Sequence, residues 1–183
     1  TTVTGWTPLE VSVSTSSGIG GGTSCALYSS DSTGERRVMC WGGGGSGQIG
    51  DGGTSSLSSP ASTDLVMLDP TTPLGASDGS ETLSSSPYDV VEVSLSEIGR
   101  FGCARSSQGH VKCWGYNAYG QLGHGNTSTA SDGEDEMGED LAFVPLGANR
   151  TATSLSVGEN HACALLDDGS VKCWGRNNYG QLG

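Results

Sequence analysis

Basic residues and long apolar runs are scarce in this sequence. Lysine and arginine together number 8 of 183 residues against 20 acidic residues, for a formal net charge of −12. A surface that binds phosphates needs clustered basic side chains, and the only adjacent pair is Arg36 and Arg37. The longest apolar runs, such as Leu65 to Leu68, are far shorter than the roughly 20 residues of a membrane helix. The sequence therefore predicts no nucleic-acid partner and no membrane span.

Charged and aromatic residues are also few, at 15% and 6%, whereas glycine supplies 31 residues. This composition favours short strands joined by tight turns over helices. The length is sufficient for one domain with a core of its own. Because Thr1 stands first and no basic-then-apolar leader follows it, we expect a processed product or a piece of a longer chain.

The six cysteines lack the close Cys-x2-Cys spacing that is typical of zinc sites. Disulfides are the favoured alternative, and they indicate an oxidising compartment such as the cell exterior. No metal and no cofactor is predicted from this cysteine pattern.

A cysteine-bracketed unit is written three times. "CARSSQGHVKCWGYNAYGQLG" (Cys103 to Gly123) and "CALLDDGSVKCWGRNNYGQLG" (Cys163 to Gly183) correspond residue by residue, and a looser copy runs from Cys25 to Gly50. "EVSVS" and "EVSLS" precede the first two copies, and "SLS" precedes the third. Aligned on Trp41, Trp114 and Trp174, the copies repeat at intervals of 73 and 60 residues. Repetition at such intervals indicates a repeat architecture, in which each unit stacks on its neighbours to form a core.

Each unit has the pattern of short β-strands. Alternating segments such as "VEVSL" precede two strands that flank a turn, and "DLVML" and "LAFVPL" are further candidates. About four strands per repeat predict an all-β protein of three propeller-type blades. The predicted divisions are a first repeat (1–52), a Ser/Thr/Pro-rich insertion with one strand (53–87), a second repeat (88–125), an acidic loop and strand (126–150) and a third repeat (151–183).

The turns fix the register of the cysteines. A three-residue loop at Asp167–Gly169 places Cys163 directly opposite Cys173, and the corresponding loop at Ser107–Gly109 gives the second hairpin the same register. Directly opposed positions of this kind lie near disulfide range. The predicted disulfides are Cys25–Cys40, Cys103–Cys113 and Cys163–Cys173.

The Cys-Trp-Gly-x-Asn-x-x-Gly-Gln-Leu-Gly pattern, carried in full by Cys113–Gly123 and Cys173–Gly183, resembles the regulator of chromosome condensation repeat. The resemblance implies β-propeller blades, of which the family's members form seven. Seven blades of about 60 residues exceed this chain, so one copy is not expected to close a ring. The first copy departs from the pattern, since Gly44 replaces the asparagine. The family includes a guanine-nucleotide exchange factor as well as proteins that use the propeller only as an interaction platform.

Side chains that recur in every unit are expected to be architectural. The tryptophans are predicted to pack against a disulfide or a neighbouring blade, and the glutamines to bond the backbone of a corner. These residues are Trp41, Trp114, Trp174, Gln48, Gln121 and Gln181.

Two segments match glycine-containing motifs of enzymes, but the secondary structure that normally surrounds each motif is not predicted around them. Gly42–Gly47 fits a dinucleotide-binding loop, but no helix pattern follows, so a blade corner is predicted. Ser77 lies within Gly-x-Ser-x-Gly, yet no strand-to-helix turn surrounds it. Neither motif predicts catalysis.

The remaining polar candidates also favour structural readings. His110, His124 and His161 are scattered beside turns, corners and strands, so no catalytic set is predicted. The acidic run Asp132–Asp140 suits calcium by composition but lacks the spacing of a known calcium loop, and a solvated loop is favoured.

Two sequons, at Asn126 and Asn149, predict N-linked glycans. Together with the cysteines they predict a secreted, non-enzymatic structural or interaction module, whose partners are other proteins or copies of itself in a filament or ring. The alternative, implied by the resemblance alone, is a guanine-nucleotide exchange factor for a small GTPase.

Overall fold

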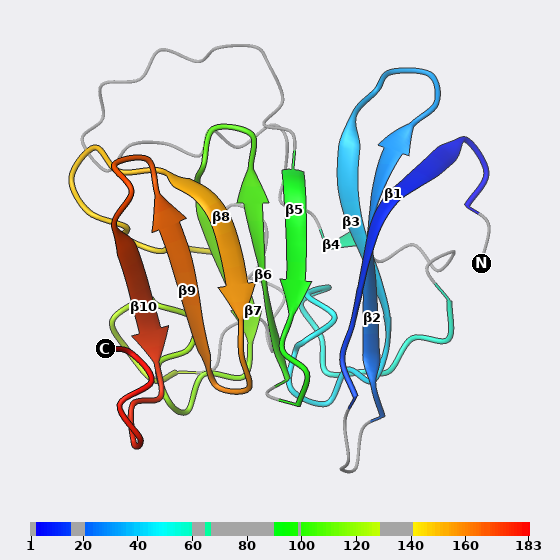
Figure 1. The fold of residues 1–183 in the computed structure, drawn as a ribbon. Coiled ribbons are helices and arrows are strands. Elements are labelled where there is room, and N and C mark those ends of the chain that lie inside the picture. The colour runs from blue at the N-terminus through cyan, green and yellow to red at the C-terminus, as the bar shows by residue number, and fades with distance from the viewer. Residues whose placement is uncertain (1–2, 16–20, 60–64, 67–89, 99, 129–140) are drawn as a thin grey trace.

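The computed structural model describes residues 3–15, 21–59, 65–66, 90–98, 100–128 and 141–183. These residues form ten β-strands in three antiparallel sheets that stand side by side (Figure 1). The first sheet contains β1 (Trp6–Val13), β2 (Thr23–Ser30), β3 (Arg36–Gly42) and β4 (Leu65–Val66). The second contains β5 (Val90–Leu95), β6 (Phe101–Ser106) and β7 (Val111–Gly115). The third contains β8 (Ala152–Val157), β9 (His161–Leu166) and β10 (Val171–Gly175).

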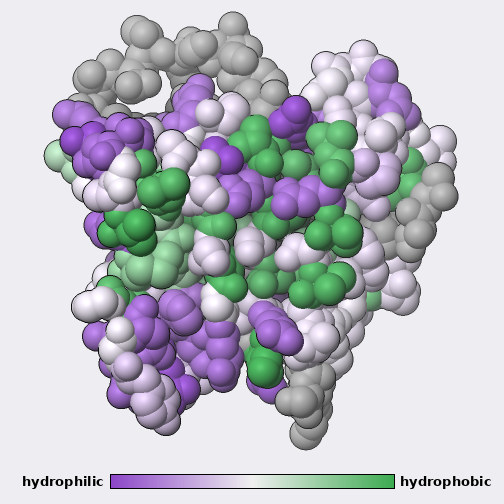
Figure 2. All heavy atoms as spheres, in the orientation of Figure 1, coloured by the Kyte–Doolittle hydropathy of each residue, from purple (hydrophilic) through white to green (hydrophobic). Residues whose placement is uncertain are grey.

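The all-β prediction is confirmed, and the three repeats form the three sheets in order. The first strands of the sheets, β1, β5 and β8, contact one another in sequence, as the blades of a propeller do. Figure 2 shows apolar side chains in a band across the visible face, bordered by hydrophilic residues. No helix in the part of the chain that the structure describes is long and apolar enough to cross a membrane.

Among the described residues, a fourth strand is present only in the first sheet, where the two-residue β4 pairs with β3. In the second sheet the predicted "LAFVPL" strand is reduced to a bridge between Lys112 and Phe143, with Val144 donating to the Val111 carbonyl at 2.9 Å. Pro145 follows immediately and has no N–H with which to extend the ladder. The third sheet has three strands among the residues that are described.

Each first strand carries a register shift at the same place. The shifts fall between Pro8 and Glu10, between Val90 and Glu92, and between Ala152 and Ser154. Such a shift re-aims the side chains that follow it. After the shift, equivalent serines of the three first strands each lie opposite the first cysteine of their unit. These serines are Ser12, Ser94 and Ser156.

The core lies between the sheets. One buried cluster joins the first and second sheets and another joins the second and third. Because each sheet contributes one face to a junction, the side chains at these junctions are the main determinants of how the blades stack.

Candidate functional site

The three hairpins join their cysteines in the register that the turns predict. Cys25 pairs with Cys40, Cys103 with Cys113 and Cys163 with Cys173, each as directly opposed residues with Cα atoms 4.1 Å apart. No cysteine remains free. A disulfide thus joins the second and third strands of every sheet at an equivalent point.

Each of these disulfides lies on one face of its sheet, which we call the disulfide face. In the first sheet this face consists of Cys25, Leu27, Val38 and Cys40, and all four side chains are buried. The equivalent positions of the third sheet are Cys163, Leu165, Val171 and Cys173.

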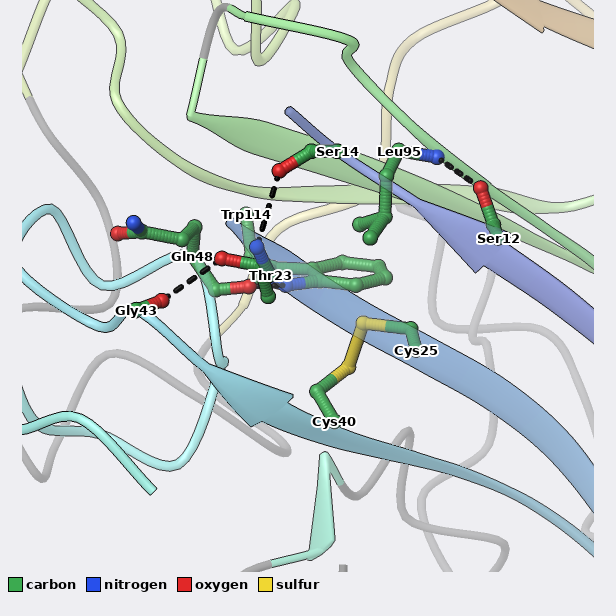
Figure 3. The surroundings of a disulfide bond; sticks show 9 residues. All are labelled: Ser12, Ser14, Thr23, Cys25, Cys40, Gly43, Gln48, Leu95 and Trp114. Atoms are coloured by element: carbon green, nitrogen blue, oxygen red, sulfur yellow. Dashed lines mark hydrogen bonds between the residues drawn. A yellow bond between two sulfur atoms is a disulfide. The ribbon is translucent and has the colours of Figure 1, made fainter. Parts of the chain in front are cut away.

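The opposite face, here called the indole face, carries the tryptophan that follows the second cysteine. In the second sheet it consists of Val93, Leu95, Ala104 and Trp114, which pack in one cluster with the Cys25–Cys40 disulfide. Figure 3 shows Trp114 and Leu95 beside that disulfide. An indole face therefore packs on the disulfide face of the preceding sheet.

A hydrogen bond fixes the indoles of the second and third sheets in place. Trp114 Nε1 donates to the main-chain carbonyl of Gln48 at 3.0 Å (Figure 3), and Trp174 Nε1 donates to that of Gln121 at 2.9 Å. Both bonds are buried, so the indole N–H and the carbonyl satisfy each other away from water. Trp41 differs, because no sheet precedes it among the described residues, and it packs beside Ala26, Tyr28 and Met39.

The glutamines shape the corner that receives the indole. The side-chain Oε1 of Gln48 accepts from Ser46 N at 2.7 Å, and that of Gln121 accepts from Tyr119 N at 2.9 Å. Gln181 repeats the bond with Tyr179 N, also at 2.9 Å.

The glycine that ends each corner leaves room for the ring. A Cβ added at Gly123 would lie 3.0 Å from Trp174 Cδ1, and Gly123 has a φ of +76° that disfavours other residues. The final glycine of the repeat is therefore required by a close approach of the next sheet.

Carboxylates add a contact that the sequence did not predict. Glu10 accepts from Val93 N at 3.3 Å, and Glu92 accepts from Leu155 N at 3.1 Å. Glu92 is also paired with Arg105 at 2.7 Å. The repeated glutamate of "EVSVS" and "EVSLS" was the signal available in the sequence, and the third sheet has Ser154 at this position.

The departure of Gly44 from the repeat has a steric cause. In the second unit the buried Asn117 accepts from Leu122 N at 2.9 Å and donates to the Asn126 and Ser128 carbonyls. In the first unit a side chain at Gly44 would overlap the Ser55 backbone. The Gly42–Gly47 segment forms a corner with a turn bond from Gly47 N to Gly44 O of 2.9 Å.

The histidines are separated into different settings. His161 begins β9, His110 lies 5.7 Å from the Phe143 ring between centroids, and His124 is half-buried. Among the described residues no three His, Cys, Asp or Glu side chains are placed to hold a metal ion. Ser77 and Asp132–Asp140 lie outside the described residues.

Sheets that stack through indole and disulfide faces define an array of β-propeller blades. The regulator of chromosome condensation (RCC1) repeat profile matches residues 99–121 and 152–181. The chain belongs to this repeat family.

Relatives agree with this assignment. The chain is 31% identical over 165 residues to the ultraviolet-B receptor UVR8 of Arabidopsis thaliana, covering 90% of this chain and 30% of the receptor. It is 40% identical over 78 residues to the X-linked retinitis pigmentosa GTPase regulator homolog of Caenorhabditis elegans, covering 43% of this chain and 5% of that protein.

Among solved structures, Prp20p from Saccharomyces cerevisiae shares the fold, with a TM-score of 0.58 and 19% identity. The match covers 100% of this chain and 34% of Prp20p. The chain thus spans about a third of the length of this protein and of UVR8.

Proposed function

We propose that the chain is a non-enzymatic protein-interaction module that works outside the cell. The observation that carries the proposal is the repeated disulfide, since all six cysteines are paired at equivalent points of three sheets. Paired cysteines persist in oxidising compartments and are rare in the cytosol and nucleus. The net charge of −12 further disfavours nucleic acid as the partner.

Glycans on Asn126 and Asn149 are part of this proposal. Both asparagines are exposed, and Asn149 lies in a turn with a φ of +54°. Asn126 uses its Oδ1 to accept from Asn117 Nδ2 and Ser128 N, which leaves its own Nδ2 as the site of attachment.

The test is the thiol content and glycan mass of the native protein. If the protein is secreted, thiol titration after denaturation without reductant should find close to zero free thiols. A reduced cytosolic protein should show about six. Enzymatic removal of N-glycans is expected to lower the mass of the wild type. The variants Asn126→Gln and Asn149→Gln are each expected to lack the mass of one glycan. Six free thiols in native material contradict an extracellular role, and an unchanged mass contradicts the glycans alone.

Regulation of a small GTPase is the second candidate, and the names of relatives favour it. One relative is called a GTPase regulator homolog, and the structure of Prp20p was described with its binding to Gsp1p and histones. An exchange assay on small GTPases decides this alternative: accelerated nucleotide release supports it, and no acceleration together with paired thiols supports the extracellular module.

Self-association is the form of interaction that we propose for this module. Stacked blades present unlike faces at their two ends, and unlike faces that fit each other produce head-to-tail rings or filaments. Other proteins remain the partners if copies do not associate.

A further inference from the structure

The second sheet has a neighbouring sheet on either side, so the exposure of its side chains does not result from a missing neighbouring sheet. Among the described residues of the second repeat, the exposed large apolar side chains are Ile98, which is 46% exposed, and Tyr119, which is 42% exposed. Ile98 lies in the loop between β5 and β6, and Tyr119 lies in the corner that follows β7. Both segments lie at the same end of the sheet, the lower end in Figure 1.

The loop between β5 and β6 is longer than its counterpart in the third sheet. A hydrogen bond from Ser96 N to the Phe101 carbonyl encloses four residues, 97–100. The equivalent bond, from Gly158 N to the His161 carbonyl, encloses only two residues. The exposed isoleucine therefore belongs to a loop that is extended in the second repeat relative to the third.

Neighbouring loops hold the base of this extended loop in place. Thr15 N donates to the Glu97 carbonyl at 2.7 Å, from the side of the first sheet. Ser96 Oγ donates to the Glu159 carbonyl at 2.7 Å, toward the third sheet. Because the base is held from both sides, a partner that binds the loop has less disorder to remove on binding.

Arg100 ends the loop in a backbone conformation that arginine rarely adopts. Its φ is +57°, in the left-handed region. The equivalent residue of the third sheet is Asn160, because the Arg100 carbonyl accepts from Tyr116 N as the Asn160 carbonyl accepts from Arg176 N. Asparagine enters the left-handed region at lower cost than arginine. A strained conformation that another residue would relieve points to a use for the arginine side chain outside the fold.

The charge of Arg100 is not neutralised within the described part of the chain. Three arginines elsewhere form ion pairs with carboxylates: Arg37, Arg105 and Arg150. In contrast, Arg100 and Arg176 have no carboxylate of a described residue within 4.0 Å. The Cζ atom of Arg176 lies 4.9 Å from the centroid of the Tyr119 ring, which joins the third repeat to the corner of the second. A guanidinium that stacks on a ring keeps its N–H groups available for a carboxylate.

Five residues of this end form what we call the loop-end surface: Ile98, Arg100, Tyr116, Tyr119 and Arg176. Tyrosine and arginine are the residue types that supply much of the binding energy at protein interfaces. We infer that the loop-end surface binds a partner protein through a segment that combines an apolar side chain with one or two carboxylates. The apolar side chain packs on Ile98 and Tyr119, and the carboxylates accept from Arg100 and Arg176. This inference rests on the proposed interaction function and names the contact and the chemistry of the partner.

The surrounding charge limits the kind of segment that fits. Glu97 and Glu159 lie in the same loops as the surface, and the whole chain has a net charge of −12. Like charges repel a long acidic run, whereas a segment without carboxylates leaves both arginines unpaired. A mostly apolar segment with few carboxylates avoids both costs.

Selection of random peptides displayed on phage, against the whole disulfide-bonded chain, tests the inference. The selected peptides are expected to share an apolar residue close to Asp or Glu. A synthetic, fluorescently labelled copy of the selected peptide is then the probe, and its anisotropy gives the Kd. Replacement of the peptide's Asp or Glu by Asn or Gln is expected to weaken binding about tenfold.

Arg100→Asn separates binding from folding. It introduces the residue of the equivalent third-sheet position, so it is expected to weaken peptide binding about tenfold while the urea midpoint stays the same or rises. Arg36→Asn is the matched control. Arg36 is also half-buried and has no carboxylate of a described residue within 4.0 Å, but it begins β3 at the opposite end of its sheet. This control is expected to bind the peptide like the wild type.

Tyr119→Ser tests the apolar part of the surface. It introduces the residue of the equivalent first-repeat position, Ser46, whose N–H makes the same bond to the glutamine of its corner. The fold of the corner is therefore expected to be retained, and peptide binding is expected to weaken several-fold as the ring is lost.

Several results overturn the inference. They are a selection that yields no peptide or only peptides without carboxylates, wild-type binding by Arg100→Asn, or equal weakening by Arg36→Asn. A lower urea midpoint for Arg100→Asn shows a structural role and also overturns it. So does self-association of the wild type that Arg100→Asn abolishes in sedimentation velocity, because the occupant is then a second copy. Thiol content is measured independently, so the inference can fail while the extracellular module stands.

Discussion

The indole N–H of Trp174 donates a hydrogen bond of 2.9 Å to the main-chain carbonyl of Gln121, which lies 53 residues earlier in the chain. The same bond joins Trp114 to Gln48 over 66 residues. Two equivalent bonds at two successive junctions show that the Trp and Gln of the repeat connect neighbouring blades. The motif therefore specifies stacking as well as the fold of a single unit.

Trp174→Phe and Trp114→Phe are each expected to lower the free energy of unfolding by about 1–3 kcal/mol, because a buried carbonyl loses its donor. Urea denaturation of the monomer at low concentration measures this. Trp41→Phe is the matched control, and it is expected to cost less because no described carbonyl accepts from Trp41. Equal losses at all three positions would show that ring packing alone decides the stability.

The disulfides are expected to differ in their rate of reduction. Cys163–Cys173 is half-buried whereas the other two are fully buried, so a mild thiol reductant reaches it first. Alkylation followed by peptide mapping at successive times reads the order. A uniform rate for the three bonds would contradict this accessibility argument.

Removal of the buried Cys103–Cys113 disulfide by paired Cys→Ala substitution is expected to cost roughly 2–3 kcal/mol, since the loop that it closes is short. The sequence separation of its cysteines is 10. Thermal or urea denaturation of the double variant gives the value. The corresponding variant at Cys163 and Cys173, which has the same separation, controls for loop length.

Glu92→Gln is expected to destabilise the protein by about 1 kcal/mol, because it removes the ion pair with Arg105 and weakens the bond to Leu155 N. The effect should shrink as salt screens the pair. Glu10→Gln, whose carboxylate makes a longer bond of 3.3 Å, is expected to show a smaller loss. Urea titrations at low and high salt compare the two variants.

His124 is expected to make stability fall in mild acid. Burial lowers the pKa of His124 from its ordinary 6.5, and the charge of Lys112 lowers that pKa further, although a hydrogen bond with the Ala142 backbone opposes both. The unfolded chain therefore takes up a proton near pH 6.5 while the folded chain does not. The free energy of unfolding decreases as pH falls from 6.5 toward the folded pKa.

His124→Gln should flatten that dependence, and denaturation between pH 7.5 and pH 5 measures the difference. His161→Gln serves as the control because His161 begins β9 of the third sheet, whereas His124 lies outside the strands. A wild-type profile that matches His124→Gln would contradict a lowered pKa.

The register of the disulfides could be predicted from local sequence. Cys163 and Cys173 are joined by a turn whose length is fixed by Asp167–Gly169, so counting along the hairpin places them opposite each other. The same reasoning applies to Cys103 and Cys113. The repeated corners and the all-β class were predictable for the same reason, since each depends on residues close together in the chain.

The fourth strand marks the limit of that reasoning. The pattern of "LAFVPL" is typical of a strand, but a ladder needs a partner edge and available N–H groups. Phe143 forms a single bridge before Pro145 ends the pairing.

The sequence by itself determined the hairpins, their disulfides and the repetition of Trp and Gln, because those features follow from turn length and strand alternation. Only the tertiary structure decided that Trp114 covers the Cys25–Cys40 disulfide and that Glu92 reaches Leu155 N. Both contacts cross between sheets, and the shift before Glu92 sets which way its side chain points. Contacts of this kind depend on how whole sheets stack, and the repeated motif does not by itself show which residues of the neighbouring sheet each side chain reaches.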